Sequence, residues 1–323
     1  MSMKRRDFIS ILGGAAVTPL AGGVALAEGR TVTLGVLVTG HPSLEIVTTG
    51  LREALARVGL VEGRNLRLVT RAGQGEVLQE MAAELVRMKV DIIVTSLTPT
   101  AQAAKKATAE IPIVMAAAGD PVATGLVASL ARPGGNVTGV TTAGAEVAAK
   151  SLELVREMFP SVRRVGVIAN ESDSFTGPYI AQLREGARRS GLELDVVMAH
   201  SAAPQEPIFE AVVAKRADAV IIQGSMVRPG TTVDLAIKHR LPSLGSNRSW
   251  PMSGGLMSYA ASLTEVYRQA ADYIDKILKG RAPADLPVAL ATKFDLVINL
   301  KAAKAIGLTI PEAFLTRADE VIE

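Results

Sequence analysis

The stretch TVTLGVLVTGHPSLEIVTTGLREALARVGL, residues 31–60, contains the two kinds of element that the rest of the chain repeats. Residues 31–40 form a continuous apolar run that ends in turn residues, a pattern typical of a strand buried on both faces of a parallel sheet. In residues 44–60, apolar side chains recur at spacings of three and four, which predicts an amphipathic helix. Gly59 or Gly63 is expected to end this helix.

The same alternation continues in two successive arrays. In the first, strands are expected at residues 65–71, 90–97 and 111–120, and helices at 76–88 and 100–110. In the second, strands are expected at 163–172, 193–201, 217–225 and 241–247, and helices at 180–192, 206–216 and 233–240. Similar short segments support the repeat of one array by the other, since VDIIVTS in the first array parallels ADAVIIQGS in the second. Each βαβ array calls for a doubly wound parallel sheet, so the pattern predicts an α/β chain with two similar lobes.

We expect the chain to pass between the lobes more than once, which would make a hinge around a cleft. Lobe 1 is predicted to comprise residues 28–142 plus about 260–285. Lobe 2 is predicted to comprise about 143–259 plus 286–323.

A glycine-rich stretch, GDPVATGLVASLARPGGNVTG (residues 119–139), could suggest a phosphate cradle. We interpret residues 122–131 as a helix with Val122, Leu126, Val127 and Leu130 turned inward. Residues 132–135 would stop it, because proline cannot continue a helix and glycines allow a tight reversal. Since these glycines follow the expected helix, the stretch is predicted to be mostly scaffold.

Composition excludes several classes of site. The chain has 323 residues, of which 48% are hydrophobic and only 3% aromatic, and it has no cysteine. Disulfides, thiolate metal sites and cysteine nucleophiles are therefore excluded. Outside the N-terminal segment acidic and basic residues are almost equal in number, and no basic run predicts a nucleic-acid partner. Motifs of P-loop enzymes, α/β-hydrolases and zinc proteases are missing. His41, His200 and His239 lack ligand spacing, so we expect no metal and no cofactor.

The first 27 residues have the features of an export signal. A basic start containing Arg5-Arg6 precedes a modest apolar region, and Ala25-Leu26-Ala27 is a small-x-small cleavage pattern. The arginine pair favours the twin-arginine type, although Lys4 stands where Ser or Thr is usual. An anchor helix or an ordinary secretory signal are the alternatives. We expect cleavage after Ala27 and a periplasmic protein that is not a lipoprotein, because no cysteine follows the site.

Several long segments resemble one known family over essentially the whole chain beyond the export signal. They are GLVEGRNL (59–66), AAELVRMKVDIIV (82–94), IPIVMAAAGDPVATGLVASLARPGGNVTG (111–139), KSLELVREMFP (150–160), GGLMSYAASLTEVYRQAADYIDKILKGRAPADLPV (254–288) and TKFDLVINLKAAKAIGLTIP (292–311). Together they look like the ABC-transporter substrate-binding family that includes tryptophan- and tyrosine-uptake binding proteins.

The resemblance implies a type I periplasmic-binding-protein architecture, related to ribose-binding proteins and LacI-like cores, with about three segments crossing between the lobes. It implies a non-enzymatic receptor that traps a small organic molecule by hinge closure and delivers it to an ABC permease. We expect a monomer. A LacI-like sensor and an enzyme on the same two-lobed fold remain alternatives.

Candidate ligand contacts follow from a general rule of open α/β sheets, in which ligands lie beyond the carboxyl ends of the strands. The candidates in lobe 1 are Thr39, His41, Ser96, Thr98 and Asp120. The candidates in lobe 2 are Asn170, Asp173, Gln223, Ser225, Asn247 and Tyr259.

Two features of these loops indicate the chemistry of the ligand. Ser96 and Thr98 precede a helix, whose N–H groups and hydroxyls suit a carboxylate, although Thr98 could serve only as an N-cap with Pro99 in the first turn. Asp120 is at least a cap and could also receive an ammonium. Phe175, Tyr179 and Trp250 could form a wall for a flat ligand, whereas Tyr267 and Tyr273 fit a core. An amino acid or aromatic acid is therefore expected.

Overall fold

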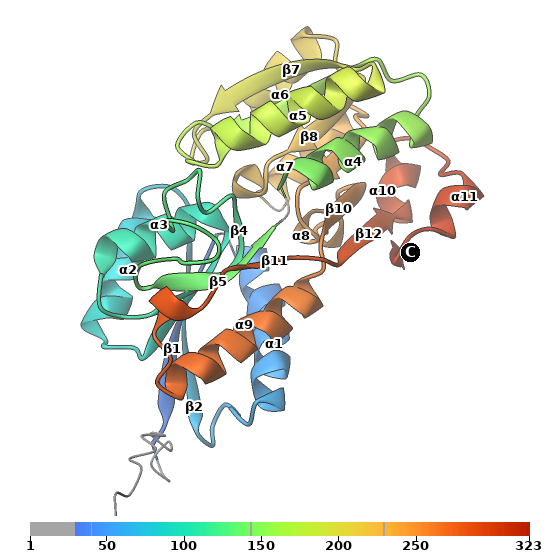
Figure 1. Cartoon of the computed structure of the whole chain (residues 1–323). Coiled ribbons are helices and arrows are strands. Elements are labelled where there is room, and N and C mark those ends of the chain that lie inside the picture. Colours follow the sequence, from blue (N-terminus) through green and yellow to red (C-terminus); the bar gives the residue numbers. More distant parts are fainter. Residues whose placement is uncertain (1–29, 40, 143, 229) are drawn as a thin grey trace, which may run out of the picture.

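The computed structural model describes residues 30–39, 41–142, 144–228 and 230–323, and gives only the backbone for residues 41–43 and 144–146. Two sheets organise these residues (Figure 1). We call the first sheet with α1, α2, α3 and α9 lobe 1, and the second sheet with the remaining α-helices lobe 2.

Lobe 1 is built on a 6-stranded sheet with the order β11-β5-β4-β3-β1-β2. All of its strand pairs are parallel. The strands are β1 (Val32–Thr39), β2 (Leu66–Gly73), β3 (Ile92–Ser96), β4 (Ile113–Gly119), β5 (Val137–Thr142) and β11 (Ala289–Leu290). The helices are α1 (His41–Arg57), α2 (Val77–Arg87), α3 (Leu97–Ala107) and α9 (Leu263–Leu278), and a short 3-10 turn, η2, spans Pro283–Asp285.

Strand β1 confirms the prediction of burial on both faces. Leu34 and Val36 pack with α1 and α9 on one face, whereas Leu37 packs with α2 and α3 on the other. Successive side chains of a strand point to opposite faces, so a strand covered on both sides must be apolar throughout. This is why the run at residues 31–40 shows no alternation of polar and apolar residues.

Lobe 2 is built on a 7-stranded sheet with the order β13-β12-β10-β9-β8-β6-β7. Its strands are β6 (Arg164–Asn170), β7 (Glu193–Ala199), β8 (Ala219–Ile222), β9 (Ser243–Gly245), β10 (Met257–Ala261), β12 (Phe294–Asn299) and β13 (Glu320–Ile322). Its helices are α4 (Gly144–Met158), α5 (Thr176–Ser190), α6 (Gln205–Ala214), α7 (Thr231–Lys238), α8 (Ser249–Met252), α10 (Leu300–Ala305) and α11 (Glu312–Leu315), with a 3-10 turn η1 at Gly224–Met226.

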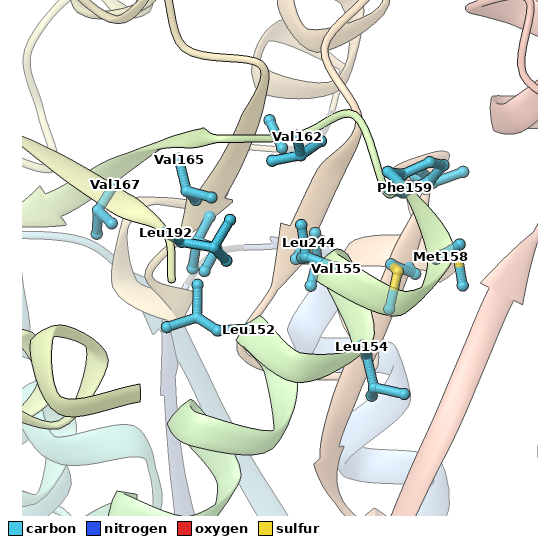
Figure 2. Packing of buried hydrophobic residues seen from close by; sticks show 14 of the residues in the cluster. Leu152, Leu154, Val155, Met158, Phe159, Val162, Val165, Val167, Leu192 and Leu244 are labelled. Atoms are coloured by element: carbon cyan, nitrogen blue, oxygen red, sulfur yellow. The ribbon is translucent and has the colours of Figure 1, made fainter. Parts of the chain in front are cut away.

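Helices cover both faces of the second sheet as well. On one face Leu152 and Val155 of α4 pack with Val165 and Leu244 of the sheet (Figure 2). On the other face the core includes apolar residues of α6, α7 and α8. All strand pairs of this sheet are parallel except β10 with β12, so β12 and β13 run opposite to the other five strands.

The two sheets confirm the repeat that the sequence predicts. The order β2-β1-β3-β4-β5 in lobe 1 recurs as β7-β6-β8-β9-β10 in lobe 2. Both are doubly wound arrangements in which the first strand of the array lies inside the sheet.

Among the described residues the chain passes between the sheets at three places: between β5 and α4, between β10 and α9, and between β11 and β12. Helix α9 packs against α1 of lobe 1 (Figure 1). Ala289 and Leu290 pair with β5, although the predicted boundary assigns residues 286–323 to lobe 2. We therefore propose to move that boundary to the segment between β11 and β12, and the division into lobes remains a proposal.

The helix predicted at residues 122–131 is wrong. Only one turn forms, in which the N–H of Leu126 donates to the carbonyl of Pro121 at 2.8 Å. Gly125 then takes a φ of 71°, a left-handed conformation that ends the turn. Val122, expected to face inward, is 43% exposed, whereas Leu126 and Val127 are buried as predicted.

Candidate functional site

The carboxyl ends of strands from both sheets border one cavity of about 120 Å³ between the lobes. Lobe 1 contributes Thr39, Ser96 and Gly119 at the ends of β1, β3 and β4. Lobe 2 contributes Gln223 and Ser246 directly after β8 and β9. The cavity therefore lies where the general rule for open α/β sheets places a ligand.

The residue at the start of α3 that lines the cavity carries an unpaired hydroxyl. Ser96 is the N-cap of α3 and only 8% exposed, and its Oγ has no hydrogen-bond partner among the described residues. Ser96 and Leu97 both line the cavity, and Leu97 has a φ of 62°, which is rare for a branched side chain. A buried hydroxyl without a partner beside backbone strain is a feature of ligand sites.

Thr98 is not the N-cap considered from the sequence. It lies inside the first turn of α3, where its Oγ1 accepts a hydrogen bond from the N–H of Gly119 at 3.0 Å. This contact ties α3 to the end of β4. Thr98 still lines the cavity, so it can serve both structure and binding.

Lobe 2 holds a buried network of polar groups behind its cavity wall. Asp173 accepts hydrogen bonds from Gln223 Nε2 at 3.0 Å, from Ser225 Oγ at 2.9 Å and from the N–H of Phe175 at 3.0 Å. The N–H of Asn170 donates to Gln223 Oε1 at 2.9 Å. Burial raises the pKa of the Asp173 carboxyl, and the bonds from Phe175 and Ser225 oppose that shift.

Of the polar side chains in this network only Gln223 reaches the cavity. The predicted site residues therefore divide into two groups. Those that line the cavity are Thr39, Ser96, Thr98, Gln223, Asn247 and Tyr259. Those that do not line it are Asp120, Asn170, Asp173 and Ser225. The His41 side chain lies outside the described residues. Asp120 caps a turn through the N–H of Ala123 at 3.0 Å, as expected for a cap.

Aromatic rings from both lobes line the cavity. Phe175 and Tyr179 come from lobe 2, with ring centroids 5.7 Å apart. Tyr259 belongs to β10 of lobe 2, and Tyr267 comes from α9 of lobe 1. Burial raises the pKa of Tyr179 and of Tyr267, which keeps both phenols neutral. Tyr267 was expected in the core; it is 3% exposed yet reaches the cavity.

Trp250 does not form the expected cleft wall. It is fully buried in the core of lobe 2, where its indole N–H donates to the carbonyl of Ser243 at 3.3 Å. Added Cβ atoms at Gly245 and Gly255 would lie within 2.1 Å of Trp250 atoms. These two glycines therefore make the space that the indole fills.

The lobes touch directly beside the cavity. A Cβ added at Gly119 of lobe 1 would lie 2.6 Å from carbons of the Phe175 ring of lobe 2. Nearby, Gln74 Nε2 donates to the carbonyl of Val227 at 3.2 Å, and Gln102 Nε2 lies 3.4 Å from Ser174 Oγ. The described cavity is therefore bounded by contacts that join the two lobes.

Sequence reasoning missed apolar contacts from helix faces. Ile46 and Val47 on α1 and Val147 and Ala148 on α4 line the cavity, together with Ser151 on α4. A search restricted to strand ends cannot find them, although their spacing on amphipathic helices is visible in the sequence.

Charge is absent from the part of the cavity wall that the structure describes: each lining side chain there is apolar or neutral. Among all the residues that the structure describes, no group of His, Asp or Glu could hold a metal ion. The helices of the described chain also include none long and apolar enough to cross a membrane.

Residues 32–322 match the model of the family described as ABC transporter substrate binding protein. The chain belongs to this family. Members bind small molecules outside the cytoplasmic membrane and work with ABC permeases, and homologues of this chain are substrate-binding proteins rather than enzymes. Its two mostly parallel sheets have the arrangement of type I periplasmic binding proteins, as expected from the sequence.

Three relatives show how far the similarity extends. A tyrosine-binding protein of Clostridioides difficile (strain R20291) is 28% identical over 272 residues, which are 83% of this chain and 78% of that protein. A conserved domain protein from Vibrio cholerae has a TM-score of 0.81 at 32% identity, with coverage of 90% of this chain and 100% of the other. An ABC domain from Streptococcus pneumonia in complex with L-Trp has a TM-score of 0.79 at 28% identity, with coverage of 91% and 100%.

Proposed function

We propose that this substrate-binding protein traps an aromatic amino acid, or a related aromatic carboxylic acid, between its lobes and delivers it to an ABC permease. One observation carries the proposal: a cavity between the lobes combines rings from both lobes with the unpaired Ser96 hydroxyl at the start of α3. Relatives named for tyrosine binding and solved with L-Trp support the same class of ligand.

The ring of the ligand would lie among Phe175, Tyr179, Tyr259 and Tyr267. Aromatic pairs prefer offset or tilted contacts at centroid distances of about 4.5–7 Å, and these contribute ~0.5–1.5 kcal/mol beyond the area they bury. Because Tyr267 belongs to lobe 1 and the other three rings to lobe 2, one flat ligand would contact both lobes at once. This arrangement favours hinge closure around the ligand.

The carboxylate would lie at the start of α3. The free N–H groups of a helix N-terminus and its dipole favour an anion there. Ser96 Oγ adds a donor that has no other partner among the described residues. Within the same residues the cavity offers no charged group, so hydrogen bonds would hold the carboxylate.

Isothermal titration calorimetry of the purified chain tests the proposal. L-Tryptophan, L-tyrosine, 4-hydroxyphenylacetate, L-leucine and glucose form a suitable panel. We expect micromolar or tighter binding of at least one aromatic carboxylate and no binding of glucose. Binding of glucose with no heat from any carboxylate would refute the proposed ligand class.

We further propose that the chain is exported by the twin-arginine route, cleaved after Ala27 and active as a periplasmic monomer. The supporting pattern lies in residues 1–27, outside the described structure. Replacing Arg5-Arg6 by Lys-Lys is expected to leave uncleaved protein in the cytoplasm, detected by cell fractionation and mass spectrometry of the N-terminus. Normal processing of this variant would point to the general secretory route.

A further inference from the structure

Asp173 is a buried carboxylate without a cationic partner among the described residues. It is 7% exposed, and its hydrogen bonds come only from neutral groups: Gln223, Ser225 and the N–H of Phe175. It precedes α5, whose N-terminal dipole also favours a negative charge. A buried charge held this way costs free energy of folding unless each of its bonds is kept.

These bonds determine the orientation of the Gln223 amide. Oε1 accepts from the N–H of Asn170 and from Thr176 Oγ1, both at 2.9 Å, and Nε2 faces Asp173. A flipped amide would set its oxygen against the Asp173 carboxylate and its NH₂ against the N–H of Asn170. The network therefore excludes the flipped form.

An amide nitrogen carries two hydrogens, and Asp173 accepts only one of those on Gln223. Within the described residues the second N–H has no hydrogen-bond partner, and Gln223 lines the cavity. The two hydrogen bonds that Oε1 accepts polarise the amide and make the free N–H a stronger donor. Lobe 2 thereby presents a donor whose direction is fixed before any ligand arrives.

Gln223 lies close to the start of α3 in lobe 1. A Cβ added at Gly224, the residue after Gln223, would lie 3.4 Å from Leu97 Cδ1. Leu97 directly follows Ser96, whose hydroxyl is unpaired within the described chain. Gln223 and Ser96 thus lie at the same end of the cavity, on opposite lobes.

We infer that Asp173 is a positioning residue, which holds Gln223 so that its free N–H binds the same ligand carboxylate that the start of α3 holds in lobe 1. The carboxylate then bridges the lobes and couples recognition to closure. This inference rests on the proposed function and deepens it, because it assigns carboxylate selectivity to a residue that does not touch the ligand.

The test is a selectivity ratio measured by isothermal titration calorimetry with L-tyrosine and L-tyrosinamide, which differ only at the carboxylate. The wild type should prefer L-tyrosine. Asp173→Asn should reduce that preference on the order of tenfold, mainly by weakening L-tyrosine binding. An Asn here cannot accept from all three donors, so the Gln223 amide is held less firmly in its direction. Gln223→Met should act in the same way and covers the case in which Asp173→Asn does not fold.

Ser225→Ala is the matched control, since it removes another donor to the same carboxylate oxygen while Gln223 keeps its bond. Its selectivity ratio should equal that of the wild type. Equal weakening of both ligands by Asp173→Asn and Gln223→Met, or an unchanged ratio in both, would overturn the inference alone. Failure of the wild type to bind any aromatic carboxylate would overturn the proposed function and the inference with it.

Discussion

The two lobes share one strand order but present different surfaces to the cavity. In lobe 1 the polar group at the start of α3, Ser96 Oγ, is left without a partner among the described residues. In lobe 2 the polar groups around Asp173 bond one another, and only Gln223 reaches the cavity. The same fold therefore provides an unpaired donor on one side and a preorganised wall on the other.

The two lobes differ because different contacts support the cavity surface of each lobe. Phe175 and Tyr179 of lobe 2 flank the start of α5, and the Asp173 bond to the N–H of Phe175 holds that corner in place. Lobe 1 instead has positive φ angles at Leu97 and Ala117, both of which line the cavity. We expect lobe 2 to be the rigid partner and lobe 1 to supply the contacts completed by the ligand.

The largest effect should come from the core of lobe 2. Trp250→Ala removes a fully buried indole and should lower the free energy of unfolding of this lobe by ~3–5 kcal/mol. Hydrogen exchange read by mass spectrometry should show the loss of protection in lobe 2 only. Tyr273→Ala on α9 of lobe 1, where the side chain is partly exposed, is the control and should cost less. Equal loss of protection in both lobes would mean that they unfold as one unit.

The next effect tests the contact between the lobes. Gly119→Val should weaken binding of L-tryptophan or L-tyrosine about 100-fold, or ~2.7 kcal/mol, because its side chain would overlap the Phe175 ring and hold the cleft open. Small-angle scattering with saturating ligand should show a larger radius of gyration than for the wild type. Gly177→Ala on α5, where an added Cβ meets nothing within 4 Å, should bind normally. A Gly119→Val protein that closes and binds like the wild type would contradict the importance of this contact.

Much of this architecture could be predicted from the sequence. Strands covered on both faces must be apolar throughout, so the runs that became β1, β3, β4 and β8 were visible, as was their repeated order. The helix at residues 122–131 was wrongly predicted, because apolar spacing does not reveal that Gly125 adopts a left-handed conformation. The short β11 was missed, since a strand of 2 residues has no periodicity.

The candidate site could be predicted only in outline. Strand ends located Ser96 and Gln223, because topology alone places them at one edge. Hydrogen bonds between residues far apart in the chain, such as Asp173 and Gln223, decide which residues line the cavity and which only support it. These bonds depend on the register of the folded strands. The burial of Trp250 depends likewise on space left by Gly245 and Gly255, which no local pattern indicates.

A smaller effect is expected at the unpaired donor of lobe 1. Ser96→Ala should weaken binding of an aromatic carboxylate about fivefold, the loss of one hydrogen bond of ~1 kcal/mol, without destabilising the ligand-free protein, since Ser96 Oγ bonds nothing described there. Thr100→Ala, one turn along α3, removes a hydroxyl that bonds the Ser96 carbonyl and should lower stability instead. Calorimetry and thermal melting of both variants separate the two roles. Unchanged affinity in Ser96→Ala would show that the ligand carboxylate does not bind at the start of α3.

The smallest effect concerns stability in acid. As the pH falls, Glu265 of lobe 1 and Asp173 of lobe 2 should change the free energy of unfolding in opposite directions. Hydrogen bonds from Arg268 and Gln269 lower the pKa of Glu265 on α9 of lobe 1 to about 2. This group stabilises the fold above its unfolded pKa near 4.5, and that contribution is lost as the pH falls toward 2. The raised pKa of Asp173 in lobe 2 acts oppositely, since folding there favours the protonated form. Glu265→Gln should therefore reduce the loss of stability between pH 5 and pH 3 by less than ~1 kcal/mol, as expected for a partly exposed pair. Urea titrations at both pH values measure it, and a steeper acid loss in Glu265→Gln than in the wild type would reverse the assigned sign.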